Sequence, residues 1–354
     1  MSRRVRSGGR GLPDWKAIAG LLVSGALLYW AFRDVDLGEV MAGVREADLL
    51  LLILAGAAAT AVFPLRAFRW GPLLKPVAPH TRYRSRFGAT CIGFGLNNLL
   101  PARVGEFARA YALSRIEPVR VSASLGSLVV ARIFDGLVVV LFLLGSLAWP
   151  SFPEVSGRDF TGGAMLVGGV FLGVFLVLLL MASRPEQAAE VFDGVVGRFL
   201  PKRFREPIRL AVGTFLEGLS SINDWRLVLQ VFGWSLSVWL MGALGFWLGF
   251  KAFGIDVPFV GGVFLGSVIA LAVALPSAPG FFGLFEAGAR IGLVEVWGVE
   301  STQAVAFAIG FHLAGFIPIT LMGLYYVWRF GFSWKEVERS EQAVEVETVT
   351  EARS

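Results

Sequence analysis

The sequence predicts an integral membrane protein that is entirely α-helical, and three observations carry this prediction. Hydrophobic residues make up 55% of the 354-residue chain and charged residues only 17%, whereas a soluble domain needs far less apolar surface. Several apolar runs reach the roughly 18–20 residues that span a bilayer core. These runs are continuous, whereas the strands of a membrane β-barrel alternate. We expect about six full spans and two broken helix pairs.

Basic residues orient the first two spans. Positively charged loops stay in the cytoplasm, so the arginine-rich tail 1–15 places the N-terminus inside. Span one, about 16–32, leads to an acidic outer loop. We interpret it as a retained span rather than a signal peptide, because no A-x-A cleavage site follows it. Span two, about 49–65, leads to a basic inner loop that begins with Arg66 and Arg69.

The next apolar run is short and is interrupted at Pro101. Basic residues flank the segment 87–113 on both sides, so we expect the chain to enter the membrane and return to the inner face as a re-entrant helix pair. Irregular backbone is tolerated at that depth only where protein or water surrounds it. Span three, about 122–149, then crosses outward, and span four, about 161–182, crosses back.

A long basic loop, about 183–226, connects the two halves on the inner side. Its apolar residues recur at helical spacing, which predicts either interfacial amphipathic helices or a solvated connector helix. Span five, about 227–251, leads to a second interrupted segment, 259–297. This segment forms either a re-entrant pair or two ordinary spans with a tight inner turn. The last span, about 302–328, is followed by basic residues, so the C-terminus is inside.

The order of elements repeats within the predicted membrane domain, 16–330, which precedes a charged tail, 331–354, that we expect to be disordered. The halves 16–149 and 161–328 each contain two spans, a broken pair and a third span, and they start on opposite sides. This pattern predicts an inverted repeat, in which matching interrupted segments mark a binding site near the midplane. Each segment also places a breaker, a glycine and a Glu–Arg pair at helical spacing. The matching residues are Pro101, Gly105, Glu106 and Arg109, and then Pro279, Gly283, Glu286 and Arg290.

Two charged residues, Arg132 and Asp135, lie close to the middle of span three. An ionised group that faces lipid at the midplane costs roughly 2.5–3.5 kcal/mol. Both side chains must therefore face the helix bundle, and we expect them to pair. The pair either fixes the packing of the bundle or belongs to a translocation pathway.

The stretch NNLLPARVGEFARAY, residues 97–111, is the most polar candidate site. The asparagines can cap broken backbone, the proline can end a helix, and the arginines can anchor among headgroups. Together, exposed helix amides and nearby arginines favour a phosphate or another anion. Glu106 then needs a cationic partner, either Arg109 or a group of the ligand. The candidate residues are Asn97, Asn98, Pro101, Arg103, Gly105, Glu106 and Arg109.

The second break offers a smaller set of candidates. Its glycines permit close approach of another backbone, and Glu286 has no evident structural need. His312 lies alone within the last span, where it either hydrogen-bonds a neighbouring helix or relays protons. The candidate residues at this break are Pro279, Gly280, Gly283 and Glu286.

Several other kinds of site are disfavoured. The single cysteine, Cys91, cannot form an intramolecular disulfide, and His80 and His312 lie far apart without ligand-like neighbours. No lysine follows a glycine, as a Walker A loop requires. The net charge of +5 resides mostly in loop arginines, which indicates membrane topology rather than nucleic-acid binding. We therefore expect no metal and no other cofactor.

These segments resemble a known family. The motif N-x-L-P-x-R-x-G-E-x-x-R at Asn98–Arg109, the stretch ARIFDGL, and P-G-x-x-G-x-x-E at Pro279–Glu286 are similar to the lysylphosphatidylglycerol synthase transmembrane-region family. The likeness covers about 15–330 and implies a lipid-handling membrane protein. In two-domain members, the membrane half is linked to moving an aminoacylated phospholipid across the bilayer, and a separate soluble domain makes that lipid.

This sequence departs from the family pattern in two ways. It ends shortly after the last span, so we expect no synthase domain and no synthesis of the lipid. Phe281 also stands where a second glycine is common in the family. A phenylalanine at that position narrows the space near the break.

Sequence and resemblance together predict a lipid flippase or translocase, without enzymatic activity, in a bacterial or archaeal cytoplasmic membrane. The arginines Arg103 and Arg109, with Arg132 beside them, would hold an anionic headgroup. Glu106 and Glu286 would meet a cationic part of that headgroup or carry a coupling proton. The expected ligands are anionic or aminoacylated phospholipids, or isoprenoid-linked lipids.

Two alternatives stay open at this point. In the first alternative, the protein is an accessory subunit that binds such a lipid for an envelope or glycosyl-transfer enzyme. In the second, it is a membrane-embedded lipid transferase. A transferase requires that Glu106 and Glu286 face each other across one cavity. Glycine-rich runs between Gly162 and Gly173 are also compatible with a homo-oligomer.

Overall fold

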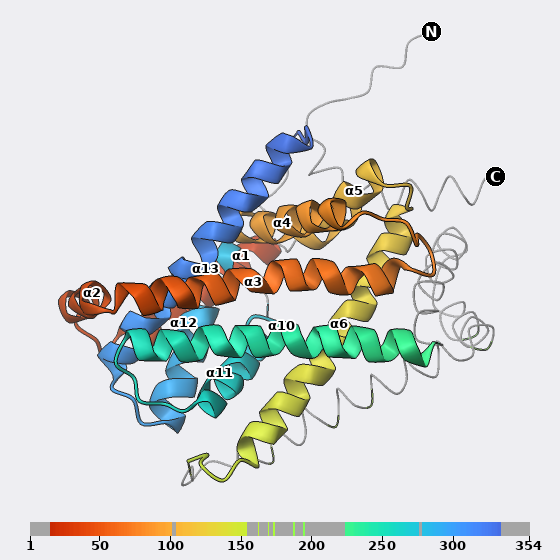
Figure 1. Cartoon of the computed structure of the whole chain (residues 1–354). Coiled ribbons are helices and arrows are strands. Elements are labelled where there is room, and N and C mark those ends of the chain that lie inside the picture. The colour runs from red at the N-terminus through yellow and green to blue at the C-terminus, as the bar shows by residue number, and fades with distance from the viewer. Residues whose placement is uncertain are drawn as a thin grey trace.

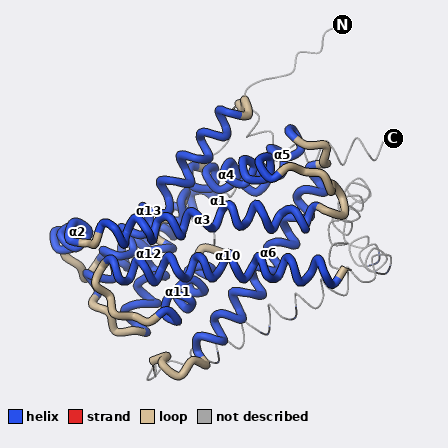
Figure 2. Tube along the Cα trace, viewed as in Figure 1, coloured by secondary structure: helices blue, strands red, loops and turns tan. Residues whose placement is uncertain are grey.

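The computed structural model describes residues 15–100, 104–153, 224–275 and 278–333, with a few single residues between 154 and 223. Every regular element in these ranges is a helix (Figures 1 and 2). The predicted span four, the inner loop up to residue 223 and both tails lie outside the described residues, as do Pro101 and Arg103.

Within the described residues, four helices are long and apolar enough to cross a membrane, which confirms the predicted class. They correspond to the predicted spans two, three, five and last, and each is longer than the roughly 20 residues that a span needs. A further helix, α1 (Trp15–Phe32), occupies the position of span one. The four long helices are α3 (Leu49–Leu74), α6 (Val121–Leu147), α10 (Trp225–Ala252) and α13 (Ser301–Arg329).

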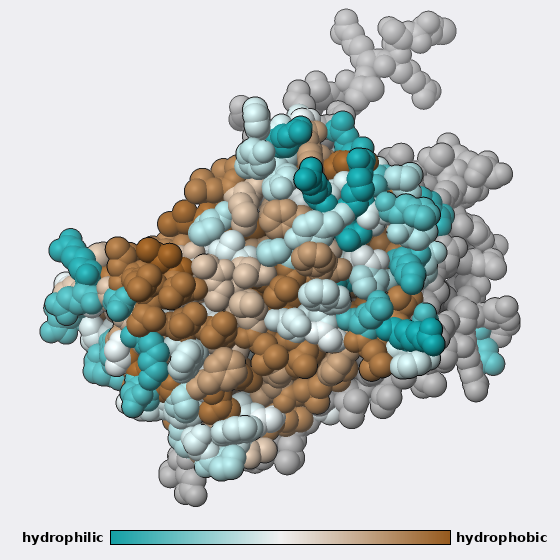
Figure 3. All heavy atoms as spheres, in the orientation of Figure 1, coloured by the Kyte–Doolittle hydropathy of each residue, from teal (hydrophilic) through white to brown (hydrophobic). Residues whose placement is uncertain are grey.

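The surface agrees with a membrane setting. Figure 3 shows hydrophobic residues over the middle of one face and hydrophilic residues toward two of its ends. Ile53, Leu229 and Leu321 on three of the long helices are each more than half exposed. Such side chains meet acyl chains rather than water when the helices cross a bilayer.

Helix α3 continues well beyond the predicted end of span two. It contains Pro64 and Pro72 in its interior and ends only at Leu74. Proline is tolerated within membrane helices because neighbouring groups satisfy the freed backbone. Consequently Arg66 and Arg69 belong to a helix inside the bundle, and their assignment to a cytoplasmic loop was wrong. Helix α3 packs along α10, and the two run side by side in Figure 1.

The outer loop predicted after span one contains a short helix, α2 (Leu37–Glu46). The carboxylate of Asp36 caps it by accepting hydrogen bonds from the amides of Gly38 and Glu39, which are free at a helix start. Val40 is buried, and α2 packs against α13.

The first broken pair consists of α4 (Tyr83–Leu99) and α5 (Gly105–Ile116), which pack against each other. Neither arm is among the described helices that are long and apolar enough to cross a membrane. The predicted break between two helices is therefore present, and the re-entrant course of 87–113 stays a prediction. A Cβ atom added to Gly105 would collide with the backbone of Gly93, so glycine permits the close contact of the two arms.

The second broken pair runs from α11 (Phe259–Ala272) through a 3₁₀ turn, η3 (Pro279–Phe281), to α12 (Leu284–Arg290) and a π-helical turn, η4 (Ile291–Val296). Each arm is too short to cross a bilayer, which favours the re-entrant form over two ordinary spans. In Figure 1, helices α4 and α5 of the first broken pair and helices α11 and α12 of the second lie toward opposite ends of the long helices. The inverted repeat stays a prediction.

Candidate functional site

Four arginines and two carboxylates from three helices meet inside the bundle. Helix α3 supplies two arginines, and α5 and α6 each supply one arginine and one carboxylate. We call this set the arginine cluster. Its members are Arg66, Arg69, Glu106, Arg109, Arg132 and Asp135.

Asp135 is the buried centre of the cluster. Its carboxylate accepts hydrogen bonds from Arg69 at 2.5 and 3.1 Å, from Arg66 at 3.1 Å and from the indole of Trp239 at 2.9 Å. The predicted pairing with Arg132 is present, but at 3.8 Å it is the longest of the three ion pairs. Two arginines from α3 therefore offset a charge that would otherwise be very costly at this depth.

Glu106 pairs with Arg132 of α6. The partner of Glu106 in the structure is thus Arg132 rather than Arg109 of its own helix, and the expected contact with a ligand stays a prediction. The Glu106 side chain is 26% exposed and the Arg132 side chain 48% exposed. This ion pair is consequently the open side of an otherwise buried cluster.

Arg109 is buried, with 4% of its surface exposed. Its guanidinium carbon lies 4.1 Å from the centre of the Trp70 ring, and its Nε atom has no hydrogen-bond partner. The Trp70 indole is itself held by a 2.8 Å hydrogen bond to Ser127. Stacking on an indole stabilises a cation but does not neutralise it. Within the described part of the chain, no carboxylate forms an ion pair with Arg109.

Three guanidinium groups lie near the ring of Phe94 on α4. The guanidinium carbon of Arg66 is 5.3 Å from its ring centre, and those of Arg109 and Arg132 are each 6.0 Å away. Any two of these guanidinium carbons therefore lie no farther apart than twice 6.0 Å. The surrounding helices α3, α4, α5, α6 and α10 contain no acid besides Glu106 and Asp135. Four arginines against two carboxylates leave two positive charges, which suits an anion.

The asparagines and glycine of the first break have structural contacts. The Asn97 side chain accepts a 2.9 Å hydrogen bond from the amide of Gly105 and so bridges the break between α4 and α5. The Asn98 side chain donates to the hydroxyl of Thr320 on α13 at 2.9 Å. These contacts hold α5 in the orientation that points Glu106 and Arg109 into the cluster.

A second polar group joins the second break to α13. The Nδ1 atom of His312 lies 2.7 Å from the Glu286 carboxylate, and its Nε2 atom lies 2.9 Å from the carbonyl oxygen of Gly280. His312 therefore contacts a neighbouring helix, which was one of the two roles expected for it. Glu286 also accepts the amide of Gly283 at 2.6 Å, so it has a structural role as a helix cap.

Arg290 anchors the end of α12 to α1 and does not pair with Glu286. Its guanidinium donates to the carbonyl of Ala31 at 2.8 Å and to the carboxylate of Asp34 at 2.9 Å, and it lies over the Trp30 ring. The hydrogen bond from Arg33, followed by that from Arg290, lowers the pKa of the Asp34 carboxyl.

Comparison with known proteins identifies the group to which these breaks and charges belong. The family model of the lysylphosphatidylglycerol synthase TM region matches residues 17–323. The chain belongs to this family. The match includes the arginine cluster, both broken helix pairs and the Glu286–His312 pair. No solved structure matches the chain.

Three archaeal relatives show how the family domain is used. Glycosyltransferase AglD of Haloferax volcanii is 26% identical over 319 residues, which cover 83% of this chain but 51% of AglD, so the chain spans about half of that protein. A UPF0104 membrane protein of Methanothermobacter thermautotrophicus is 25% identical over 84% of this chain and 91% of its own length. A UPF0104 membrane protein of Methanocaldococcus jannaschii is 23% identical over 230 residues, which cover 64% of this chain and 91% of that protein.

The two family glutamates belong to separate networks. Glu106 contacts Arg132, whereas Glu286 contacts His312 and Gly283. Each glutamate is thus engaged by a different set of partners within the described residues. The same residues contain no group of three His, Cys, Asp or Glu side chains suited to a metal ion.

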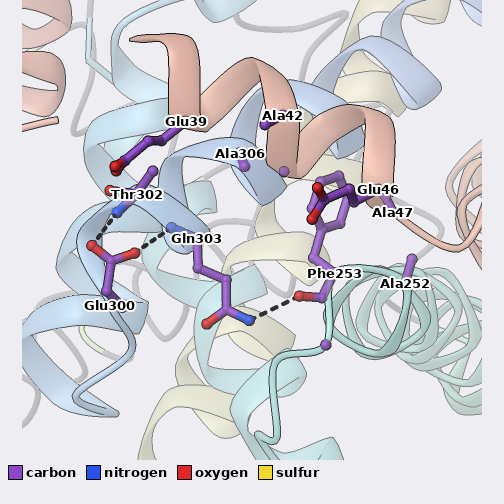
Figure 4. A pocket seen from close by; sticks show the side chains of 12 residues that line it. Glu39, Ala42, Glu46, Ala47, Ala252, Phe253, Glu300, Thr302, Gln303 and Ala306 are labelled. Atoms are coloured by element: carbon purple, nitrogen blue, oxygen red, sulfur yellow. Dashed lines mark hydrogen bonds between the residues drawn. The ribbon is translucent and has the colours of Figure 1, made fainter. Parts of the chain in front are cut away.

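A cavity of about 520 Å³ lies between α2, the end of α10 and the start of α13 (Figure 4). Glu39, Glu46 and Glu300 line it. The Glu300 carboxylate caps α13 by accepting the amides of Thr302 and Gln303. This cavity is thus lined by carboxylates and contains no arginine of the arginine cluster.

Proposed function

We propose that this family member binds the anionic headgroup of a membrane lipid at the arginine cluster and moves the lipid between leaflets. The observation that carries the proposal is the burial of Arg109 against Trp70 with no carboxylate partner in the described residues. A net charge inside a membrane protein is costly. A bound headgroup would remove that cost, which explains why the cluster contains more arginines than acids.

The partly exposed Glu106–Arg132 pair gives the proposed site its entrance. Arg132 would meet an incoming headgroup first, and Arg109 would bind it deeper. Glu106 would release Arg132 to the ligand or contact a cationic part of the headgroup. The guanidinium groups suit this role because their planar donors match the oxygens of a phosphate.

The two broken helix pairs would act as gates. In transporters with inverted repeats, discontinuous helices from both halves surround the substrate and alternate their access to the two sides. The first broken pair carries Glu106 and Arg109, and the second carries Glu286, which contacts His312 of α13. Proton release from Glu286 and His312 would be the coupling step. We place the protein in the cytoplasmic membrane, with both termini inside.

A second candidate is lipid binding in support of glycosyl transfer, without transport. The relative named glycosyltransferase AglD favours it, because the matched region is about half of that protein. In this alternative, the arginine cluster presents a lipid phosphate to a separate enzyme. Neither proposal assigns catalysis to the residues of this chain.

A lipid-exchange assay tests the proposed function. The purified protein is reconstituted into liposomes with fluorescent anionic and aminoacylated phospholipids, and a membrane-impermeant quencher reports how fast the protected pool becomes exposed. We expect the parent to accelerate exchange and Arg109→Gln and Glu106→Gln to abolish it. Arg115→Gln is the matched control, because Arg115 lies on the same helix but over Phe332, outside the cluster.

Each outcome of the assay decides between the candidates. Exchange that depends on Arg109 and Glu106 supports transport. Lipid binding without exchange, for every lipid tested, favours the accessory role. Equal loss in Arg109→Gln and Arg115→Gln would show that the assay reports folding rather than a headgroup site.

A further inference from the structure

The charge of the arginine cluster limits the headgroups that it can hold. Asp135 is fully engaged by Arg66, Arg69 and the Trp239 indole. Glu106 is engaged by Arg132, and Arg109 has no acidic partner. Because the described helices around the cluster supply no other acid, we take its positive excess of two to be offset by the ligand.

Membrane lipids differ in how well they can offset this excess. A lysyl ester of phosphatidylglycerol carries two ammonium groups and one phosphodiester, so its headgroup is cationic and would increase the excess. Phosphatidylglycerol carries a single negative charge. A terminal phosphate monoester carries about −1.5 to −2 at pH 7 and exposes three acceptor oxygens.

We propose that the arginine cluster selects a lipid that ends in a phosphate monoester, over phosphodiester and aminoacylated lipids. This inference rests on the proposed headgroup site and narrows its chemistry. Its geometric support is that the guanidinium carbons of Arg66, Arg109 and Arg132, from three helices, all lie within 6.0 Å of the Phe94 ring centre. A terminal phosphate has three free oxygens for three such groups, whereas a phosphodiester has two.

Burial strengthens the selection. Arg109 is almost completely buried and the Arg66 side chain is 11% exposed, so little water screens their charges. The second negative charge of a phosphate monoester is therefore worth more here than at a protein surface. We expect phosphatidic acid to bind about tenfold or more tightly than phosphatidylglycerol.

Native mass spectrometry of the full-length protein in detergent tests this selection. Phosphatidic acid, phosphatidylglycerol and lysyl-phosphatidylglycerol with identical acyl chains are offered at equal concentrations. We expect phosphatidic acid to be bound preferentially and the lysyl ester least. Raising the pH from 5 to 8 ionises the monoester further, since its second pKa is about 6. Retention of phosphatidic acid should therefore increase, while that of phosphatidylglycerol should not change.

Variants and a competitor complete the experiment. Arg109→Gln should reduce the preference for phosphatidic acid at least threefold, and Arg115→Gln should preserve it. If Arg109→Gln does not fold, Arg132→Gln, at a half-exposed position, replaces it. Inorganic phosphate at millimolar concentration should fail to displace phosphatidic acid. Displacement by it would show that the ligand is the free anion and would overturn the lipid assignment.

The outcomes separate this inference from the proposed function. Equal binding of phosphatidic acid and phosphatidylglycerol, with no effect of pH, overturns the selection for a monoester but leaves lipid exchange intact. Preferential binding of the lysyl ester overturns it as well and restores the aminoacylated substrate. If phosphatidic acid binds selectively while no lipid exchanges in liposomes, the selection stands and the transport function fails.

Discussion

The carboxylate of Glu286 and the Nδ1 atom of His312 lie 2.7 Å apart and connect the second helix break to the last span. Both side chains are buried, and the rings of Phe282 and Phe285 flank the imidazole. In such surroundings a carboxylate that loses its partner has no water to replace it. The pair should therefore stabilise the break.

We predict that His312→Phe lowers the free energy of unfolding by about 3 kcal/mol or more, because it leaves the Glu286 carboxylate buried without its partner. In a Glu286→Gln background, the same change should cost clearly less, since no charge is stranded. Denaturant unfolding of the four proteins in detergent measures this double-mutant cycle. Equal costs in both backgrounds would show that the two residues are not coupled.

The two carboxylates of the arginine cluster should respond differently to neutralisation. Asp135→Asn leaves Arg66 and Arg69 without their shared partner in a buried place, and we expect a loss of about 3–5 kcal/mol or failure to fold. Glu106→Gln breaks an ion pair that is partly exposed, so we expect a change of about 0–1 kcal/mol together with loss of lipid exchange. Thermal unfolding beside the exchange assay checks this contrast. A Glu106→Gln protein that is as unstable as Asp135→Asn would assign Glu106 to structure alone.

Much of the fold was predictable because hydrophobic run length and arginine placement act locally along the chain. The long helices, both breaks and the depth of Arg132 and Asp135 follow from those two signals. The end of span two did not, because Arg66 and Arg69 have the sequence signature of a cytoplasmic loop. Tertiary contacts override that signature, because Asp135 pairs with Arg66 and Arg69 inside the bundle and offsets their charges.

The pairings within the site were not predictable from spacing. Glu106 finds Arg132, and Glu286 finds His312, each across 26 positions of sequence and between different helices. The Glu–Arg spacing of three or four within one helix suggested local pairs instead. One local signal was available for α3. Arg66, Arg69 and Trp70 recur at intervals of three and four, which places them on one helix face.

Gly105 should be intolerant of even one added methyl group. An added Cβ would overlap the Gly93 carbonyl and the Asn97 side chain, which both belong to the facing arm α4. We predict that Gly105→Ala costs about 2 kcal/mol or more, because backbone has to move. Gly145→Ala in α6 is the control, since nothing lies within 4 Å of its added Cβ, and it should be neutral or slightly stabilising. Thermal unfolding of both variants decides the comparison, and equal stability would mean that the arms can separate without cost.

Phe281 offers a test of backbone strain at the second break. Its φ angle is 62°, in the left-handed region that glycine adopts readily, and Gly280 before it has a φ of 70°. The family's usual glycine at this position thus has a conformational reason. We predict that Phe281→Gly is more stable than Phe281→Ala by about 1 kcal/mol, because both lack the ring and only alanine keeps the strain.

The neighbouring Phe282 provides the matched control, because its φ angle is −55°. There we expect the opposite order, with Phe282→Ala more stable than Phe282→Gly, since glycine only adds freedom to the unfolded chain. Both Phe282 variants should fall well below the parent, because the ring packs against His312 and Phe316. Denaturant unfolding of the four variants gives both differences. The same order at both positions would mean that the left-handed turn at Phe281 carries no strain, and that the space its ring takes is the only consequence of the substitution.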